Sequence, residues 1–306
     1  MEILPYSKDR QEEIMMVEKF YAEKYPFAES FDVLDLKNPL LNGRKNILLA
    51  LQSGKVVGFS KFLSRQNFSS KFYHHIWLDI KTVPFNGAHE VMKKLFQSSI
   101  RPIRESTKSY FRAAGTRICV KLHESETERS RFFEELGFLP WIDFYYMERD
   151  LELPVMPVKL PESLLVKVWK PKKEPEILKY LSAEQSCFPD SPLEYRYLNY
   201  FFQRPDWKSQ GAVIAVFDGK ENLVASLMVY PSSNGVYYTE EVFVVNRWRG
   251  KGVARALMSE ALIYLQNRQA RSALLSVTSD RTTALKIYRE CGYVHTFTRK
   301  VLVLPI

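Results

Sequence analysis

The sequence predicts a mixed α/β (α+β) fold built as two similar domains, each with a central mixed β-sheet and helices on both faces. Three observations support this prediction: the length, an internal repetition and a proline-rich segment near the middle. The chain has 306 residues, and a single hydrophobic core usually stops growing at about 250 residues. Hydrophobic residues make up 46% of the chain, which supplies packed cores and excludes intrinsic disorder.

Two pairs of similar segments indicate the repetition. A hairpin pattern around Gly54 returns around Gly219, 165 residues later. The segment RFFEELGF at 131–138 resembles KIYRECGY at 286–293, with the two glycines 155 residues apart. In both segments we expect a short helix that ends on the glycine, which adopts the left-handed conformation of a C-cap. Both halves therefore follow one order: strand, helices, hairpin, long strand, long helix, strand, helix, strand.

Prolines separate the two halves. The segment LELPVMPVKLPE at 151–162 contains three prolines within eight positions, and proline continues neither a helix nor a central strand. We therefore expect an extended linker at 152–163, between a first domain at 1–151 and a second domain at 164–306. In the second domain we expect strands at 164–169, 212–218, 222–231, 236–245, 272–278 and 294–304, and helices at 174–186, 191–203, 251–268 and 281–291.

Composition excludes several classes of protein. The three cysteines, Cys119, Cys187 and Cys291, form neither a disulfide framework nor a metal-ligand spacing. The N-terminus lacks a secretory signal, and no apolar run approaches the ~18 residues of a membrane-spanning helix. We therefore expect a cytoplasmic, metal-free protein with no membrane partner. The net charge of +9 is spread along the chain, and no nucleic-acid-binding motif occurs, so we expect no nucleic-acid partner.

The segment EEVFVVNRWRGKGVARALM at 240–258 has the pattern of an apolar strand, a basic glycine-containing turn and a helix. A helix N-terminus leaves N–H groups unpaired and carries a partial positive charge, so it attracts anions. Gly250 and Gly252 would let a phosphate approach the backbone, and Arg247, Arg249 and Lys251 would add positive charge. The spacing fits neither a P-loop nor a dinucleotide-binding fingerprint. The sequence predicts an anion site here, with an ordinary strand-to-helix turn as the alternative.

The pattern Arg-x-x-Gly-x-Gly directly after a strand resembles the coenzyme A pyrophosphate loop of the GNAT superfamily of N-acetyltransferases. Arg247, Gly250 and Gly252 occupy its three defining positions. The resemblance implies two GNAT-like domains, each with a sheet that splays between its fourth and fifth strands, and acetyl-CoA as the co-substrate. The cofactor-binding residues that it implies are Val244, Val245, Arg247, Trp248, Arg249, Gly250, Lys251, Gly252, Val253, Ala254, Arg281 and Ala284.

A second family element lies downstream of the loop. The segment RTTALKIYRECGY at 281–293 resembles the family stretch Asn-x-x-Ala-x-x-x-Tyr-x-x-x-Gly-Phe. Ala284 and Tyr288 match it, and in the family that tyrosine lies near the thioester sulfur and donates a proton to the departing thiolate. The resemblance makes Tyr288 the candidate general acid, with a core tyrosine as the alternative. Arg281 departs from the usual asparagine, whose side chain commonly contacts the pantetheine arm.

The resemblance also implies direct attack by an amine, through a tetrahedral intermediate and without an acyl-enzyme. Glu240 is the candidate base, because an acidic residue on this strand takes the amine proton in many relatives; a surface glutamate is the alternative. Glu241 points to the opposite face of the strand. A backbone N–H of Val244 or Val245 is the candidate donor to the oxyanion. No His/Asp arrangement supports Cys291 as a nucleophile, so we expect it to pack.

The first half resembles the same fold without the same site. Its turn near Gly87 is shorter than the loop of the second half, has one glycine and has no arginine. Phe133 stands where Tyr288 stands in the second half, and Arg129 replaces the small Ala284. We therefore expect the first domain to be degenerate, to perform no catalysis and to bind no coenzyme A.

The sequence predicts a cytoplasmic tandem N-acetyltransferase, monomeric or homodimeric, that moves an acetyl group from acetyl-CoA to a small-molecule or peptide amine. We expect the acceptor pocket to be lined by 188–200, by the hairpin after Tyr230 and by part of the first domain. The aromatic residues at 195–202 either line this pocket or pack in the core. The alternative function is a non-catalytic acyl-CoA sensor or scaffold. Nothing in the sequence names the acceptor.

Overall fold

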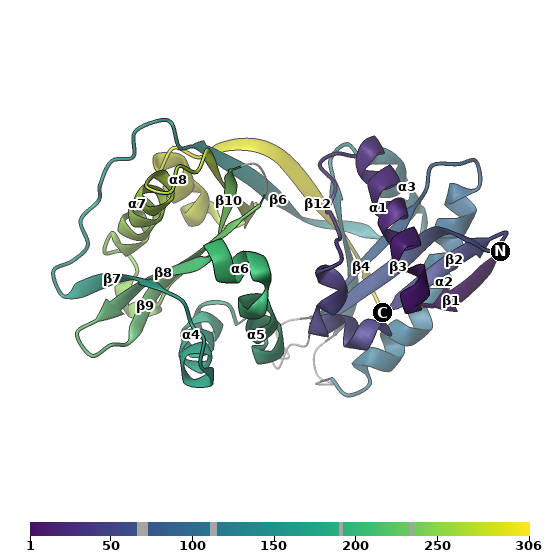
Figure 1. Cartoon of the computed structure of the whole chain (residues 1–306), viewed down its shortest axis with the longest axis horizontal. Helices are drawn as coiled ribbons and strands as arrows, with labels where there is room; N and C mark the ends of the chain where they lie inside the picture. Colours follow the sequence, from purple (N-terminus) through teal and green to yellow (C-terminus); the bar gives the residue numbers. More distant parts are fainter. Residues whose placement is uncertain (66–72, 111–114, 190–191, 233–234) are drawn as a thin grey trace. The chain divides into compact units, whose positions relative to one another are not determined.

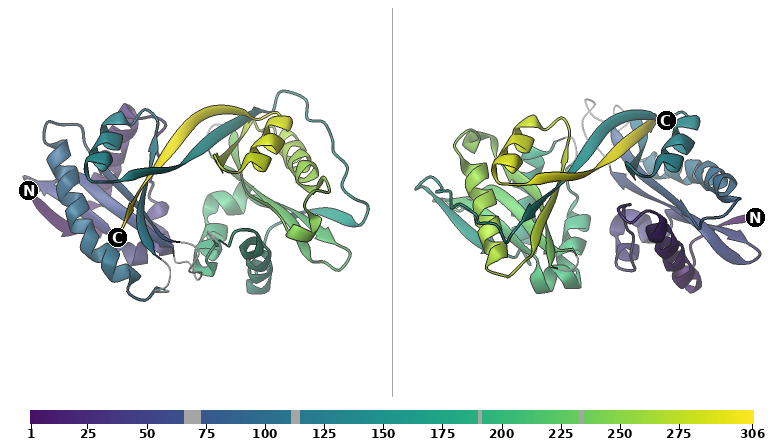
Figure 2. Two further views of the ribbon diagram at one scale, coloured as in Figure 1. Left: turned by 180° about the vertical axis from the view of Figure 1, so that it is seen from behind. Right: turned by 90° about the horizontal axis from the view of Figure 1, so that it is seen from above.

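The computed structural model of the chain describes residues 1–65, 73–110, 115–189, 192–232 and 235–306. The chain forms two compact units: the first comprises 1–143 with 299–306, and the second comprises 144–298. Each unit has a mixed β-sheet with helices on both faces (Figure 1, Figure 2), which confirms the predicted fold class. Among the described residues, no helix is both long enough and apolar enough to cross a membrane.

The second unit contains the glycine turn of the sequence motif. Its elements are β7 (Leu164–Trp169), α4 (Glu174–Cys187), α5 (Tyr195–Gln203), α6 (Pro205–Gln210), β8 (Ala212–Asp218), β9 (Leu223–Pro231), β10 (Val236–Val244), α7 (Val253–Gln266), β11 (Ser272–Thr278) and α8 (Thr282–Glu290). The strands lie in the order β7-β8-β9-β10-β11, and 144–150 of β6 (Leu139–Asp150) lies beside β11. Strands β10 and β11 run parallel, whereas the other pairs are antiparallel. The expected elements match these bounds to within a few residues, and α6 is an addition.

Helices cover both faces of this sheet. Helices α7 and α8 lie on one face, and α4, α5 and α6 lie on the other (Figure 1). Helix α7 buries Val253, Leu257, Ala261 and Leu265, which recur every fourth position and form a single apolar stripe. The first residue of this stripe directly follows the glycine turn, so packing of α7 fixes the position of the turn beside the end of β10.

Strand β10 diverges from β11 toward its C-terminal end. Within the described part of the second unit, β10 pairs with β11 at 236–238 and no further along the strand. A β-bulge follows, because the step from Glu240 to Phe243 on β10 matches a step of one residue fewer on β9. Glu241 lies inside the bulge with a φ of 51°, and a bulge bends its strand and increases the local twist. The sheet is therefore splayed between its fourth and fifth strands, as predicted, and the glycine turn follows this splay.

The first unit repeats the same order of elements. They are β1 (Glu2–Pro5), α1 (Gln11–Lys24), β2 (Ile47–Gln52), β3 (Lys55–Arg65), β4 (His74–Thr82), α2 (Ala88–Thr107), β5 (Thr116–His123) and α3 (Thr127–Glu135), with 299–305 of β12 (Val294–Pro305) beside β5. Helices α2 and α3 lie on one face of the sheet and α1 on the other (Figure 2). Strands β4 and β5 are the parallel pair and separate after Trp77.

The last strand of each half joins the sheet of the other unit. Residues 144–150 of β6 pair with β11, and 299–305 of β12 pair with β5. The compact units therefore differ from the predicted domains 1–151 and 164–306 by an exchange of the two final strands. The physical reason is that the alternation of a strand specifies which face is buried but not which sheet the strand joins.

The proline-rich segment 152–163 forms neither helix nor strand, and it lies within the second unit rather than between the two. Ser259 on α7 donates a hydrogen bond to the carbonyl of Met156 at 2.9 Å and accepts one from the N–H of Val158 at 3.2 Å. The segment that the sequence predicts as a linker is therefore hydrogen-bonded to α7.

A network of buried charged side chains joins α1, β4 and α3 in the first unit. Arg129 donates to Asp79 at 2.7 Å and to the hydroxyl of Tyr21 at 2.8 Å, and it also pairs with Glu126. Burial disfavours the charged carboxylate of Asp79, but Lys81 and other nearby cations hold its pKa well below the ordinary value. The network is electrostatically satisfied only while each partner is present.

We expect Arg129→Met to lower the free energy of unfolding by about 3–5 kcal/mol, because it removes the buried guanidinium that pairs with the carboxylates of Asp79 and Glu126. The side chain of Arg129 is 5% exposed, and that of Glu126 is fully buried. Urea unfolding at neutral pH measures the change. The matched control is Arg131→Met on the exposed side of the same helix, which should change stability by less than about 0.5 kcal/mol. Equal effects of the two variants would contradict the assignment.

Candidate active site

The glycine turn forms an open surface between β10 and α7. A short 3-10 turn at 246–248 follows β10, and α7 begins at Val253. Gly250 and Gly252 have φ values of 74° and 79°, a region that other residues enter at a cost. A Cβ atom built on either glycine meets nothing within 4 Å. Glycine is therefore required here by backbone conformation, and the space over the turn is free to receive a ligand.

The N-terminus of α7 opens onto this turn. Gly252 is the N-cap, it provides no side-chain cap, and no acidic residue lies in the first turn of the helix. The first backbone N–H groups of a helix have no partner within the helix, and they lie at its positive end. The N–H groups of Val253 and Ala254 are therefore positioned for an anion. This geometry agrees with the anion site that the sequence predicts.

The basic side chains of the turn are already engaged. Arg247 forms an ion pair with Asp218 at 2.7 Å, which ties the turn to the end of β8. Arg249 donates through Nε to the carbonyl of Val244 at 2.9 Å. The Nζ atom of Lys251 lies 4.8 Å from the centroid of the Trp248 ring. The pairing of Arg247 differs from the expectation that its charge faces an anion, so its evident role in this structure is to fix the turn.

The end of β10 distinguishes the two backbone groups proposed for the oxyanion. The N–H of Val245 donates to the carbonyl of Val224 at 2.9 Å, so it is occupied within the sheet. Hydrogen-bonded and non-hydrogen-bonded positions alternate along an antiparallel pair. Val244, which lies opposite Ala225, therefore directs its N–H to the other side, where β11 has separated from β10. The geometry favours Val244 over Val245.

Tyr288 lies on α8, in the core between the sheet and α7. It is 8% exposed. Burial, then the neighbouring Cys291 and the carboxylate of Glu240, raise the pKa of Tyr288, while Arg281 opposes the shift. The phenol therefore remains protonated at neutral pH and is a hydrogen-bond donor. The helix ends at Gly292, whose φ of 84° is the left-handed C-cap that the sequence predicts.

Glu240 connects three strands at the splay. Its Oε2 atom accepts a hydrogen bond from the hydroxyl of Tyr230 on β9 at 2.6 Å. Its Oε1 atom accepts a longer one from Ser276 on β11 at 3.4 Å. The sequence analysis did not identify Tyr230 or Ser276. A signal for Tyr230 exists, because the hairpin places it directly opposite Tyr238, two residues before Glu240 on the same face.

The remaining candidates surround this centre. Arg281 is exposed at the N-cap of α8, and Ala284 is half-buried against the core on the first turn of that helix. Cys291 is half-buried, and burial is the main cause that raises the pKa of its thiol. A neutral thiol is a poor nucleophile, which agrees with the expectation that Cys291 packs. The part of the expected acceptor pocket at 190–191 and 233–234 lies outside the described residues.

A buried polar pair bridges β10 and β11 where they begin to separate. Thr239 donates through its hydroxyl to the carbonyl of Leu274 at 3.2 Å, and it lies 2.7 Å from the hydroxyl of Tyr293. Both side chains are almost fully buried, with exposures of 0% for Thr239 and 2% for Tyr293. This pair connects the strand that holds Glu240 to the segment after α8.

The corresponding position in the first unit has different geometry. Gly87, at the N-cap of α2, has a φ of −95°, and a Cβ there would lie 2.5 Å from the ring of Phe85. The turn is therefore filled by its own side chain. Phe133 is fully buried, and Arg129 enters the ion network described above. None of these three residues reproduces the open turn or the phenol of the second unit.

Comparison with known proteins agrees with this geometry. Residues 176–293 match the sequence model of the Acetyltransferase (GNAT) family. This part of the chain is therefore similar to GNAT acetyltransferases. A mycothiol acetyltransferase from Acidothermus cellulolyticus is 24% identical over 198 residues, which cover 59% of this chain and 60% of that protein.

Two solved structures have the same fold. A tandem GNAT protein from the clavulanic acid biosynthesis pathway matches with a TM-score of 0.72 over 99% of this chain and 98% of its own, at 12% identity. A GCN5-related N-acetyltransferase from Sphaerobacter thermophilus matches with a TM-score of 0.66 over 85% of this chain and 80% of its own, at 19% identity. These likenesses establish a GNAT fold across the chain, including the tandem arrangement.

The Thr239–Tyr293 pair can be tested by a double-mutant cycle. We expect Thr239→Val and Tyr293→Phe each to lower the free energy of unfolding by about 1–2 kcal/mol, because each leaves a buried hydroxyl without its partner. The double variant should cost less than the sum, because it leaves no orphaned hydroxyl. Chemical denaturation gives all three values, and strictly additive losses would show that the two hydroxyls are not coupled.

Proposed function

We propose that the second unit is an acetyl-CoA-dependent N-acetyltransferase that acts on an amine by direct attack. The observation that carries the proposal is that an open glycine turn at a helix N-terminus follows a splayed strand, with a carboxylate on β10 and a protonated phenol on α8. Glu240 and Tyr288 are close enough for the carboxylate to contribute to the raised pKa of the phenol. The similarity of residues 176–293 to GNAT acetyltransferases supports the same conclusion.

The residues of the turn fit the phosphates of acetyl-CoA. Gly250 and Gly252 leave the space over the backbone open, and the free N–H groups at the start of α7 offer donors to a pyrophosphate. Lys251 is exposed beside them, over the ring of Trp248, and supplies a positive charge. We assign Arg247 to positioning the turn, since its charge is paired with Asp218. When bound, acetyl-CoA supplies an activated acyl thioester.

The chain's own groups then account for the proton movements. Glu240 accepts a proton from the attacking amine, the N–H of Val244 donates to the carbonyl oxygen as negative charge develops, and Tyr288 donates to the departing sulfur. A C–N bond forms and the C–S bond breaks, so the products are an amide and a free thiol. One proton leaves the amine and one reaches the thiolate, so the reaction needs no other reactant.

The features of the first unit support catalysis by the second unit alone. Its turn is filled by Phe85, it has Phe133 in place of a phenol, and Arg129 occupies a buried ion network. We propose that the first unit neither binds acetyl-CoA nor catalyses transfer.

A non-catalytic acyl-CoA sensor remains the second candidate, because the open turn alone would suffice for binding. The two functions differ in one readout. An enzyme releases free thiol from acetyl-CoA when an amine is added, whereas a sensor binds acetyl-CoA and releases none across peptides, polyamines, aminoglycosides and amino acids.

The loop assignment is tested by Gly250→Asp compared with Gly250→Asn. Both residues tolerate the left-handed conformation, and they differ essentially in charge. We expect the aspartate variant to bind acetyl-CoA about tenfold or more weakly than the asparagine variant, because like charges about 4 Å apart repel by about 1–4 kcal/mol. Isothermal titration gives both affinities. If the two variants bind equally well, the pyrophosphate does not lie at this turn.

The role of Tyr288 is tested by Tyr288→Phe. We expect turnover to fall by about 100- to 10,000-fold, the usual contribution of a general acid or base, while affinity for acetyl-CoA changes little. The pKa of Tyr288 is raised above its ordinary value of 10.0, so deprotonation of this phenol should cause no loss of rate below pH 10. A thiol-release assay across pH measures both. Undiminished turnover in Tyr288→Phe would remove the assignment.

A further inference from the structure

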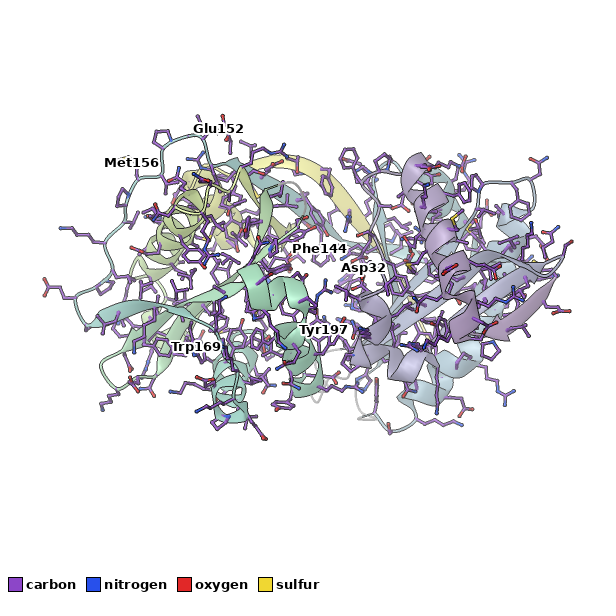
Figure 3. All side chains as sticks on the ribbon, in the orientation of Figure 1. Asp32, Phe144, Glu152, Met156, Trp169 and Tyr197 are labelled. Carbon is purple, nitrogen blue, oxygen red and sulfur yellow. The ribbon has the colours of Figure 1, made fainter. Side chains whose placement is uncertain are left out.

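Four aromatic rings gather around Glu240 on the α5 face of the second unit. Tyr197 and Phe201 lie one turn apart on α5, with ring centroids 6.2 Å apart and nearly parallel planes (Figure 3). Phe201 meets the ring of Tyr230 edge-on at 5.1 Å, and Tyr230 lies 5.3 Å from Tyr238. Glu240 accepts the hydrogen bond of Tyr230 at 2.6 Å. These five residues form what we call the aromatic subsite.

Three rings of the subsite, those of Tyr197, Phe201 and Tyr230, pack against the buried cluster on this face without being fully buried. Tyr197, Phe201, Tyr230 and Tyr238 are each half-buried, whereas Phe202, the neighbour on the same helix, is 3% exposed and packs in the core. Core packing therefore accounts for Phe202 and leaves the four rings with partly open surfaces. The aromatic residues that the sequence places at 195–202 thus divide between the two uses that the sequence analysis left open.

The chemistry of the subsite selects for a cation. The face of an aromatic ring carries partial negative charge and attracts an ammonium group, with a further gain where water is excluded. Glu240 adds a full negative charge at the end of the subsite nearest to Tyr288. The rings and the carboxylate together suit a positive head group.

We propose that the amine acceptor is a protonated alkylamine, and that Tyr197, Phe201, Tyr230 and Tyr238 with Glu240 form its binding subsite. This inference rests on the proposed function, which places the reacting amine at Glu240. An anionic acceptor would meet a carboxylate and four ring faces of the same sign, and it would be repelled. The alkylamine enters charged, is oriented by the rings, and transfers one proton to Glu240, which passes it to solvent before attack. A second proton leaves nitrogen to Glu240 as the amide forms, and the thiolate takes one from Tyr288, so the charged amine releases one net proton per turnover.

Tyr230 is a positioning residue in this arrangement. Its hydroxyl occupies Oε2 of Glu240. Oε1, which accepts a long 3.4 Å hydrogen bond from Ser276, is the oxygen that we assign to receive the proton of the amine. Burial, then the adjacent carboxylate, raise the pKa of Tyr230 well above its ordinary value. The phenol therefore stays protonated at neutral pH and donates to Glu240, which fixes the orientation of the carboxylate.

The test uses n-hexylamine, which is charged at neutral pH, and 1-hexanol, its neutral counterpart. We expect calorimetry on the full chain to show binding of n-hexylamine that is at least about tenfold tighter than that of 1-hexanol. Replacing a ring in Tyr238→Leu or Phe201→Leu should weaken n-hexylamine by roughly 2- to 30-fold, the range of one cation–π contact. It should leave the affinity for 1-hexanol nearly unchanged.

Conservative variants separate recognition from folding. Tyr238→Phe keeps the ring and should retain the affinity for n-hexylamine. The matched control is Tyr264→Leu, which makes the same change to a half-buried tyrosine of α7 on the opposite face of the sheet and should leave binding unchanged. Tyr230→Phe keeps the ring but removes the hydrogen bond to Glu240, so it should lower kcat for n-hexylamine while KM changes little.

The outcomes distinguish this inference from the proposed function. Equal affinity for n-hexylamine and 1-hexanol overturns the subsite, even if other amines cause thiol release from acetyl-CoA. A loss of n-hexylamine binding in Tyr264→Leu as large as in Tyr238→Leu also overturns it. Selective binding that depends on Tyr238 but produces no thiol release supports the subsite and removes the proposed transfer.

Discussion

The separation of β10 from β11 is the constraint on which the site of the second unit depends. Three paired positions at 236–238 hold the strands together, and the bulge that contains left-handed Glu241 then turns β10 away. Because β11 leaves, the N–H of Val244 faces outward from its strand pair, and the carboxylate of Glu240 reaches the region of Tyr288. Without the bulge, regular pairing with β11 would engage the N–H of Val244, which the proposed reaction uses, in a hydrogen bond within the sheet.

The two units show how one fold can keep or lose a site. Both have a parallel strand pair that separates, a long helix that connects the two strands of this pair, and a short helix that ends on glycine. In the second unit, the short helix carries the small Ala284, which is half-buried against the core. In the first unit, Arg129 at the matching position fills the equivalent region with charged side chains that satisfy one another. In the first unit, a buried ion network therefore occupies this region and excludes both water and ligand.

Much of the site was predictable because its signals are local. Gly250 and Gly252 are required by backbone conformation, and the periodicity of α7 places its N-terminus directly after them. The partners of these residues were less accessible to sequence reasoning. Asp218 pairs with Arg247, Ser276 contacts Glu240, and Tyr293 contacts Thr239 across long separations in the chain. Such pairs depend on which strands become neighbours in the sheet, and the local sequence pattern does not specify strand neighbours.

The sequence by itself determined the element order, the repetition and the glycine turn with its helix. It also placed Tyr288 on a short helix and Glu240 on the strand before the turn. Periodicity, capping residues and glycine conformation operate over a few residues, so they can be read along one chain. Only the tertiary structure decided that β6 and β12 exchange sheets and that the proline segment lies on α7. It alone also placed Phe201 of α5 against Tyr230, whose hydroxyl binds Glu240. Strand partners and ring contacts are chosen by the packing of distant segments, because backbone hydrogen bonding is the same whichever strand supplies it.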